Sequence, residues 1–255
     1  MQGLVVRFED ESLLVVEKPA GIHTAPLHAG EEGTLLGMVM EAYPEVRHLP
    51  GFKTVEPGLL HRLDRETSGL VVVARTAQAF QTLRAGFETM RKQYAAGCAI
   101  VEQPTADSFT VTSRFAPYGP GRRRVRVVTA EEKSPWVLEA ATRDVHETTA
   151  HVLRRTEGRA LVLVEITRGF RHQIRAHLSH AGLPLLGDVL YGRPVPEPFV
   201  QRMYLHAVRI GLRHPVTGVA LVVESPLPPE FAALFGIEPA AGLPAFETGR
   251  KGATS

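Results

Sequence analysis

The chain of 255 residues has a single cysteine, Cys98, so no disulfide can form within it. Disulfides are rare in the reducing cytoplasm, and the apolar stretch 95–101 around Cys98 favours a buried, inert thiol. No apolar run approaches the ~18 residues that a membrane-spanning helix needs, and the N-terminus lacks the pattern of a secretory signal. We therefore expect a cytoplasmic protein that is neither secreted nor embedded in a membrane.

Net charge is also low, at +2, and 22% of the residues are charged against 44% that are hydrophobic. That composition is ordinary for a globular protein with a proper core. The arginines are unevenly spread, however. One cluster is Arg122, Arg123, Arg124 and Arg126, and a second is Arg168, Arg171 and Arg175. Clustered arginine is typical of a phosphate-binding surface, although an exposed, solvated strand explains the first cluster equally well.

The sequence lacks the usual patterns of metal and nucleotide sites. It has 11 histidines, of which His172, His177 and His180 lie close together, the last two about one helical turn apart. Zinc sites normally add nearby cysteines or a His-Glu-x-x-His pattern, and neither accompanies these histidines. A glycine-rich phosphate loop is absent as well. We therefore expect no metal and no cofactor.

Hydrophobic periodicity predicts many strands and few helices. Strands are expected at 13–16, 70–74, 94–101, 108–113, 125–129, 148–155, 160–167, 204–212 and 219–224, and helices at 35–42, 76–90, 172–181 and 229–235. Strand, helix and strand do not alternate regularly, which favours an α+β fold around a mostly antiparallel central sheet with flanking helices. Because no internal linker stands out, we expect one domain over residues 1–236 and a disordered tail over 237–255.

Residues 61–75 are the most informative stretch, reading His-Arg-Leu-Asp-Arg-Glu-Thr-Ser-Gly followed by an apolar run. Asp64 lies between Arg62 and Arg65, just before a bend and a buried strand. Nearby positive charge favours an ionised carboxylate, which suits a nucleophile, a base or an anchor better than a general acid. The alternative is a solvated ion pair worth about 0–1 kcal/mol, and the residues alone leave both interpretations open.

This stretch resembles the catalytic motif of the RluA-type pseudouridine synthases, His-Arg-Leu-Asp-x-x-Thr-Ser-Gly, at every fixed position. Four other parts of the chain resemble family motifs in the right order: an opening motif at 15–21, Lys-x-Tyr at 92–94, a strand with a His-Gln-Ile-Arg helix and a Gly-Asp-x-x-Tyr-Gly turn at 161–192, and closing segments at 205–207 and 214–218. One departure is Phe170, which stands where the family commonly has an arginine.

The resemblance implies a pseudouridine synthase fold with a mixed sheet, acting as a stand-alone catalytic domain without the S4 extension of some members. It further implies isomerisation of specific uridines in ribosomal or transfer RNA, without a cofactor. Asp64 would be the catalytic nucleophile or base, Arg175 its partner through a planar guanidinium that can hold a carboxylate with two bonds, and Tyr94 would lie against the target base. Arg62 would fill the space that the base leaves.

The remaining candidates are residues expected to contact RNA near this site or on the arginine clusters. They are Arg65, Thr67, Arg122, Arg123, Arg124, Arg168, Arg171, His172 and Gln173. We expect RNA as the partner, no membrane association, and a monomer. Two other functions compete with this one: a non-catalytic RNA-binding relative, which should have lost Asp64 or Arg175, and an unrelated hydrolase, which normally needs a second carboxylate.

Overall fold

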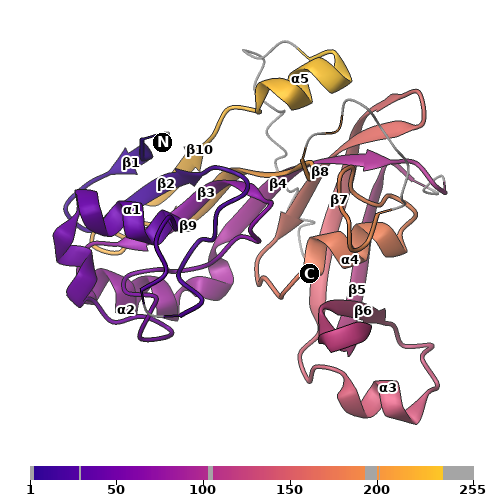
Figure 1. The fold of residues 1–255 in the computed structure, drawn as a ribbon, viewed down its shortest axis with the longest axis horizontal. Helices are drawn as coiled ribbons and strands as arrows, with labels where there is room; N and C mark the ends of the chain where they lie inside the picture. The colour runs from indigo at the N-terminus through magenta and orange to yellow at the C-terminus, as the bar shows by residue number, and fades with distance from the viewer. Residues whose placement is uncertain (1–2, 29, 103–105, 193–199, 201, 238–255) are drawn as a thin grey trace, which may run out of the picture.

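The computed structural model describes residues 3–28, 30–102, 106–192, 200 and 202–237. Ten strands form one sheet in the order β1-β2-β3-β9-β4-β8-β7-β5-β6, with β10 also paired to β9 (Figure 1). Their bounds are β1 Val5–Glu9, β2 Leu13–Lys18, β3 Ser68–Ala74, β4 Arg91–Ala99, β5 Ser108–Tyr118, β6 Arg124–Val128, β7 His146–Thr156, β8 Arg159–Ile166, β9 Leu205–Arg213 and β10 Ala220–Glu224.

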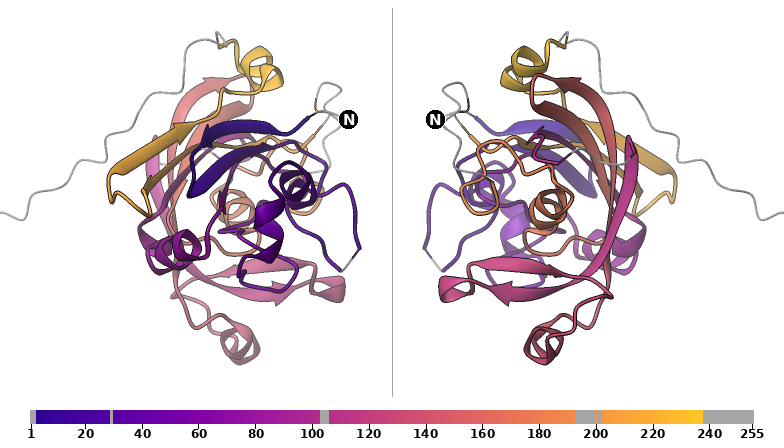
Figure 2. Two further views of the ribbon diagram at one scale, coloured as in Figure 1. Left: turned by 90° about the vertical axis from the view of Figure 1, so that its left-hand side faces the viewer. Right: turned by 90° about the vertical axis from the view of Figure 1, so that its right-hand side faces the viewer.

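Within the described residues, five short helices and three turns of 3-10 helix accompany the sheet. The helices are α1 Leu35–Ala42, α2 Ala77–Ala85, α3 Pro135–Ala140, α4 Gln173–His180 and α5 Pro229–Phe235, and the turns are η1 Pro44–His48, η2 Phe87–Thr89 and η3 Pro120–Arg122. Figure 1 shows α1 and α2 beside the N-terminal half of the sheet and α4 beside the other half, while α3 lies away from the body. Figure 2 shows how the strands of that second half curve around α4.

The two faces of the sheet bury different sets of side chains, as alternation along a strand requires. On one face, Val71 and Val73 of β3 belong to the core that contains Leu36 of α1 and Leu178 of α4. On the other face, Val72 packs in the core with α2, and α5 closes a separate core over β4 and β8. The segment Ser68–Ala74 is buried throughout, which explains its continuous apolar run.

The two halves of the sheet meet where β3 runs parallel to β9, through the pairs Ser68–His206 and Gly69–Ala207. The other strand pairs within the described residues are antiparallel. Gly69 has a φ of 110°, and a Cβ there would lie 2.3 Å from the carbonyl oxygen of Ala207. Only glycine therefore allows the backbones to approach this closely.

The expected fold class, a mixed and mostly antiparallel sheet with flanking helices, is confirmed. Helix α2 begins as expected after Thr76, whose hydroxyl accepts from the Ala79 N–H, but it ends at Ala85 rather than near residue 90. Strand β1 and helix α3 were not expected from the sequence. Except for residue 237, the tail expected at 237–255 lies outside the described residues.

Candidate active site

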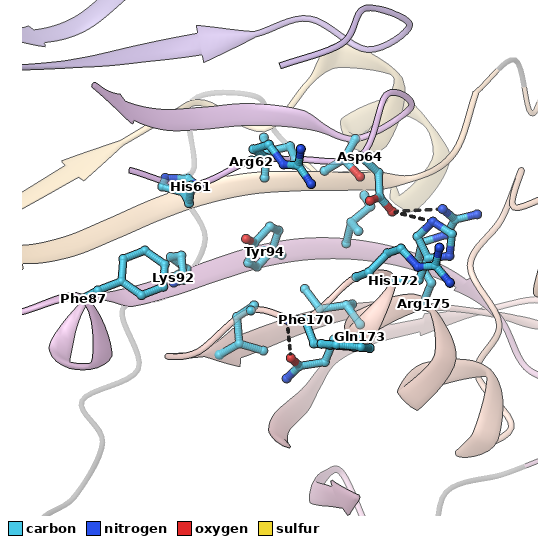
Figure 3. A pocket seen from close by; sticks show the side chains of 17 residues that line it. His61, Arg62, Asp64, Phe87, Lys92, Tyr94, Phe170, His172, Gln173 and Arg175 are labelled. Carbon is cyan, nitrogen blue, oxygen red and sulfur yellow. Dashed lines mark hydrogen bonds and ion pairs between the residues drawn. The ribbon is translucent and has the colours of Figure 1, made fainter. Parts of the chain in front are cut away.

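A cavity of about 260 Å³ opens on the face of the sheet that carries α1 and α4. Most of its walls come from the loop 61–67 before β3, from strand β4, and from the loop 169–172 with the start of α4. Phe87 of η2, Ile166 of β8 and Leu205 of β9 complete them. Figure 3 shows Asp64, His172 and Arg175 at one end, Tyr94 in the middle, and His61, Lys92 and Phe87 at the other end. The cavity therefore gathers segments that lie about a hundred residues apart in the sequence.

Asp64 is held by Arg175, whose Nη1 donates to the Asp64 Oδ2 at 2.9 Å. The other edge of the guanidinium makes a two-bond contact with Asp188, at 2.7 Å from both Nε and Nη2. The bidentate partner of Arg175 is thus Asp188, while Asp64 receives a single bond. Burial disfavours the charge of Arg175, but the two carboxylates together hold its pKa above the ordinary value.

Asp188 was missed by sequence reasoning, although the Gly-Asp-x-x-Tyr-Gly turn was noticed. Its side chain is fully buried, and its Oδ1 also accepts from the backbone N–H groups of Leu190 and Tyr191. The carboxylate is therefore fixed by its own turn before it fixes Arg175. This arrangement aims the one remaining guanidinium nitrogen at Asp64.

His172 approaches Asp64 from the start of α4, with its Nε2 3.9 Å from the carboxylate Oδ2. Its backbone is left-handed, with a φ of 57°, which is uncommon for a residue with a side chain. The Tyr191 hydroxyl accepts from the Val125 N–H at 2.7 Å and lies 3.1 Å from the His172 Nδ1. When this hydroxyl donates to Nδ1, the proton of the neutral ring is on Nε2, facing Asp64. Burial lowers the pKa of His172 and favours this neutral form.

Lys18 of β2 holds the loop that carries Asp64 through hydrogen bonds to the backbone. The buried ammonium donates to three carbonyl oxygens, those of Pro19, Ile22 and Arg65, at 2.8–2.9 Å. The Thr67 N–H donates to the Asp64 carbonyl oxygen at 3.0 Å, which closes the bend just after the carboxylate. Asp64 is therefore placed by its own loop as well as by Arg175.

The two arginines beside Asp64 in the sequence have other partners. Arg62 lines the cavity with a side chain that is 52% exposed, and it pairs with Glu56 at 2.9 Å. Arg65 points outward, donates to the Gly21 carbonyl oxygen at 2.8 Å, and does not line the cavity. The hydrogen-bonded cation of Asp64 is therefore the distant Arg175 and not a neighbour in the chain.

Tyr94 forms part of the cavity floor, since β4 presents its ring beside Asp64. It is buried, and burial together with the charge of Asp64 raises the pKa of its hydroxyl. The hydroxyl is therefore protonated at neutral pH.

The segments that form the cavity match a known protein family. A family model described as RNA pseudouridylate synthase matches residues 12–180. That range includes all the residues that line the cavity except Leu205 of β9. The chain belongs to this family. The expected enzyme class, an RNA pseudouridine synthase, is confirmed by the same match and by the relatives.

The chain is 34% identical over 248 residues to a protein of Pseudomonas aeruginosa named ribosomal large subunit pseudouridine synthase D, with 92% of this chain and 71% of that protein covered. An uncharacterized RNA pseudouridine synthase of Bacillus subtilis is 33% identical, with 91% and 71% covered. The synthase D of Nitrosomonas europaea is 32% identical, and the chain spans 64% of its length. The solved structure of human RNA pseudouridylate synthase domain containing 1 shares the fold, with a TM-score of 0.69, 22% identity, and 95% and 91% of the two chains covered.

The departure from the family motif at Phe170 has a structural explanation in this synthase. The ring stacks on Phe115 of β5 at 5.0 Å between centroids, so the loop before α4 is anchored by aromatic packing. Gln173 supports the same loop, since its side chain accepts from the Phe170 N–H and donates to the Glu147 carbonyl oxygen. Gln173 is buried and therefore supports the wall of the cavity from within.

The two arginine clusters divide between the cavity and its surroundings. Arg171 lines the cavity and donates to the carbonyl oxygen of Arg122. Arg168 does not line it and instead pairs with Asp144 at 2.7 Å and Glu88 at 3.8 Å. Arg122, Arg123 and Arg124 lie outside the cavity, on the segment 119–145 that contains η3, β6 and α3 and that we call the arm.

Two of the three histidines considered for metal binding, His172 and His177, have other hydrogen-bond partners. Both ring nitrogens of His177 have partners, the hydroxyls of Thr148 and Ser113, each at 2.8 Å. Within the described residues, no group of three or more metal-ligating side chains comes together. Among the helices of those same residues, none is long and apolar enough to cross a membrane.

Proposed function

We propose that this protein converts specific uridines of ribosomal or transfer RNA to pseudouridine, with Asp64 as the nucleophile or base. Large-subunit ribosomal RNA is the favoured substrate because similar proteins bear that name. One observation carries the catalytic assignment: Asp64 is 29% exposed in the cavity while Arg175 occupies only its Oδ2. Among the described residues, Oδ1 has no hydrogen-bond partner and is left to meet the substrate.

The chemistry asks little beyond these side chains. The bond between N1 of uracil and C1′ of the ribose breaks, the base turns, and C5 bonds to C1′. C5 then loses a proton and N1 gains one, so uridine and pseudouridine are isomers. No electrons or groups are exchanged with another molecule, so the reaction needs no cofactor. Asp64 can add to the sugar or the base, or take a proton from the sugar, and each role uses an ionised carboxylate held by Arg175.

The target uridine must leave its stack to reach a recessed carboxylate, which costs a few kcal/mol. Arg62 stands half-exposed at the cavity mouth, where its side chain can enter the space that the base leaves. Tyr94 then packs against the flipped ring. Asp64 removes the proton from C5, either directly or with the Tyr94 hydroxyl as a relay.

Replacing Asp64 by Asn tests the proposal, because the change conserves volume but removes the charge. Wild-type protein should form pseudouridine in unmodified large-subunit ribosomal RNA or transfer RNA, measured by mass spectrometry of nucleosides. Asp64→Asn should lower turnover by more than about a hundredfold and leave RNA binding nearly unchanged. Turnover within a factor of a hundred of wild type would show that Asp64 is neither nucleophile nor base.

The same assay separates the competing functions. Release of free uracil would indicate a hydrolase, whereas RNA binding without any pseudouridine in either substrate would indicate a non-catalytic relative. Asp107→Asn is the matched control, since it makes the same change at an exposed carboxylate outside the cavity and should leave turnover unchanged. Sedimentation of the protein, alone and with RNA, tests the expected monomer, and fractionation of cells tests the expected cytoplasmic location.

A further inference from the structure

At the end of the cavity away from Asp64 lies a buried cation to which no described residue offers a hydrogen-bond acceptor. Lys92 is 2% exposed, lines the cavity, and its Nζ has no hydrogen-bond partner among the described residues. The ammonium lies 4.3 Å from the centre of the Phe87 ring, which partly compensates its charge. Burial lowers the pKa of Lys92 to about 8, so the group is still mostly charged at neutral pH.

His61 brings a second unsatisfied donor to the same end. Its Nε2 accepts from the Val72 N–H at 3.2 Å, so the proton of the neutral ring is on Nδ1. Burial, with the nearby charge of Lys92, lowers the pKa of His61 to about 3 and keeps the ring neutral. Nδ1 is buried, and no described residue accepts its proton. His61 and Lys92 both line this end of the cavity (Figure 3), and the charge of Lys92 is close enough to affect His61.

Two buried donors without acceptors are costly, because each has lost its hydration without a replacement. Neither nitrogen is open to solvent in the free protein, so a ligand that brings an acceptor recovers that cost once the two side chains turn towards it. The surroundings favour a flat, neutral group: Phe87, Tyr94 and Ile166 line the cavity between and around the donors. A carbonyl oxygen on the edge of a base fits this environment better than a phosphate, which would bring its full charge and hydration into an apolar wall.

Resting on the proposed function, we propose that Lys92 and His61 form a carbonyl-binding subsite that receives O4 of the target uracil. The glycosidic N1 must lie at Asp64, where the bond to the sugar breaks. C4 is the ring atom opposite N1, so its oxygen points to the end of the cavity away from Asp64. On β4, Lys92 and Tyr94 are two residues apart and share one face, about 7 Å from each other along the strand.

The same subsite serves the product. When uracil turns about its N3–C6 axis, C5 takes the place of N1 and O2 takes the place of O4. The donors therefore meet a carbonyl oxygen before and after the turn. Cytosine presents an amino group where uracil presents O4, so two donors at this position also reject cytosine.

Sulfur substitution in the RNA tests the subsite, because sulfur is a poor hydrogen-bond acceptor. The probe is a stem-loop containing the uridine that the wild-type protein modifies, bound to the Asp64→Asn variant and followed by fluorescence anisotropy. We expect 4-thiouridine at the target to weaken binding by about tenfold or more, and 2-thiouridine to weaken it far less. Adding Lys92→Met should abolish this difference and weaken binding of uridine and pseudouridine stem-loops alike.

Lys53→Met is the matched control, because Lys53 is exposed, lies outside the cavity, and should leave the sulfur preference unchanged. The comparison of the two sulfur probes with Lys92 intact does not depend on how any Lys92 variant folds. Equal binding of uridine and 4-thiouridine stem-loops would overturn the subsite, and a preference that survives Lys92→Met would remove Lys92 from it. A wild-type protein that forms no pseudouridine would instead overturn the proposed function, and this inference with it.

Discussion

At the scale of single residues, two buried lysines near the catalytic loop are in opposite situations. Lys18 has three carbonyl acceptors, whereas Lys92 has none among the described residues. Burial lowers the pKa of both lysines, to about 7 for Lys18 and about 8 for Lys92, so the hydrogen bonds are what separates them. A buried donor with satisfied partners supports the fold, and one without acceptors weakens it. The same substitution at the two positions should therefore change stability in opposite directions.

Lys18→Met should lower the free energy of unfolding by about 3 kcal/mol or more, because three carbonyl oxygens lose their shared hydrogen-bond donor. Lys92→Met should raise it by up to about 3 kcal/mol at pH 7, because an unpartnered charge is replaced by an apolar chain of similar length. Urea titration of the free proteins measures both changes. A stability loss in Lys92→Met would mean that the ammonium has a partner in solution and that the carbonyl subsite is already filled.

The difference between wild type and Lys92→Met should also depend on pH. The folded pKa of Lys92, about 8, lies below the ordinary value of 10.5, so the charge destabilises the folded state. This destabilisation is complete below pH 8 and disappears as the pH rises towards 10.5. Urea titrations of the two proteins at pH 7 and pH 10 should therefore converge at the higher pH, and a constant gap would contradict burial as the cause.

At the scale of helices and strands, the sequence predicted the elements that have a strong apolar pattern. Helix α1 has its expected bounds, and the expected strands end within three residues of their expected ends, except β5, which continues five residues further to Tyr118. Strand β1 was missed because it is a short edge strand whose residues are all at least partly exposed. Helix α3 was missed because none of its residues is buried, so no apolar stripe marks it.

The site was predictable only where a family motif marked it. Asp64 and Arg175 were paired in advance by resemblance, and the structure brings them together. The flanking Arg65 was expected near the site, yet it points away because successive side chains around a bend diverge. The role of Asp188 depends on packing between a turn and a helix, and a single sequence contains no signal for such a contact.

The arginines of the arm are expected to contact RNA phosphates. Arg122, Arg123 and Arg124 lie on the arm, outside the cavity, and the first two are exposed. Replacing all three by Gln should weaken RNA binding and flatten its salt dependence by roughly 0.7–0.9 in slope for each lost phosphate contact. Turnover at saturating RNA should barely change, because phosphate contacts position the substrate without joining the reaction.

RNA binding of the wild type and the triple variant, measured at several salt concentrations between about 50 and 300 mM, gives the two slopes. Arg84→Gln is a suitable single control, because Arg84 lies over the Phe52 ring and outside the cavity. An unaltered slope in the triple variant would assign the cluster to solvated surface with no partner.

At the scale of the whole molecule, the active site straddles the join between the two halves of the sheet. Asp64 precedes β3 on one side, and Arg175 follows β8 on the other. The parallel contact of β3 with β9 at Gly69 sets the spacing between these halves. Any residue that pushes β3 from β9 should therefore disturb folding and catalysis together.

Gly69→Ala is the sharpest such change, since its Cβ would meet the Ala207 carbonyl oxygen at 2.3 Å. We expect a loss of about 3 kcal/mol or more in the free energy of unfolding, with lower turnover in whatever protein still folds. Gly158→Ala is the matched control: its φ is 68°, but no atom lies within 4 Å of the added Cβ. Its loss should be only about 1 kcal/mol. Equal losses in the two variants would show that backbone strain, not the strand contact, sets the cost.

The arm ends in a stretch that the rest of the molecule scarcely touches. Strand β6 ends at Val128, and the chain is next bonded to the sheet at Thr142. The Thr142 N–H donates to the Phe115 carbonyl oxygen, and the Thr142 hydroxyl accepts from the Phe115 N–H. Between these points α3 buries no residue, and Trp136 is 81% exposed. Residues 130–141 are consequently a natural graft site: foreign sequences of different length can be inserted there, and libraries of them screened for new RNA targets, while the catalytic cavity keeps its walls.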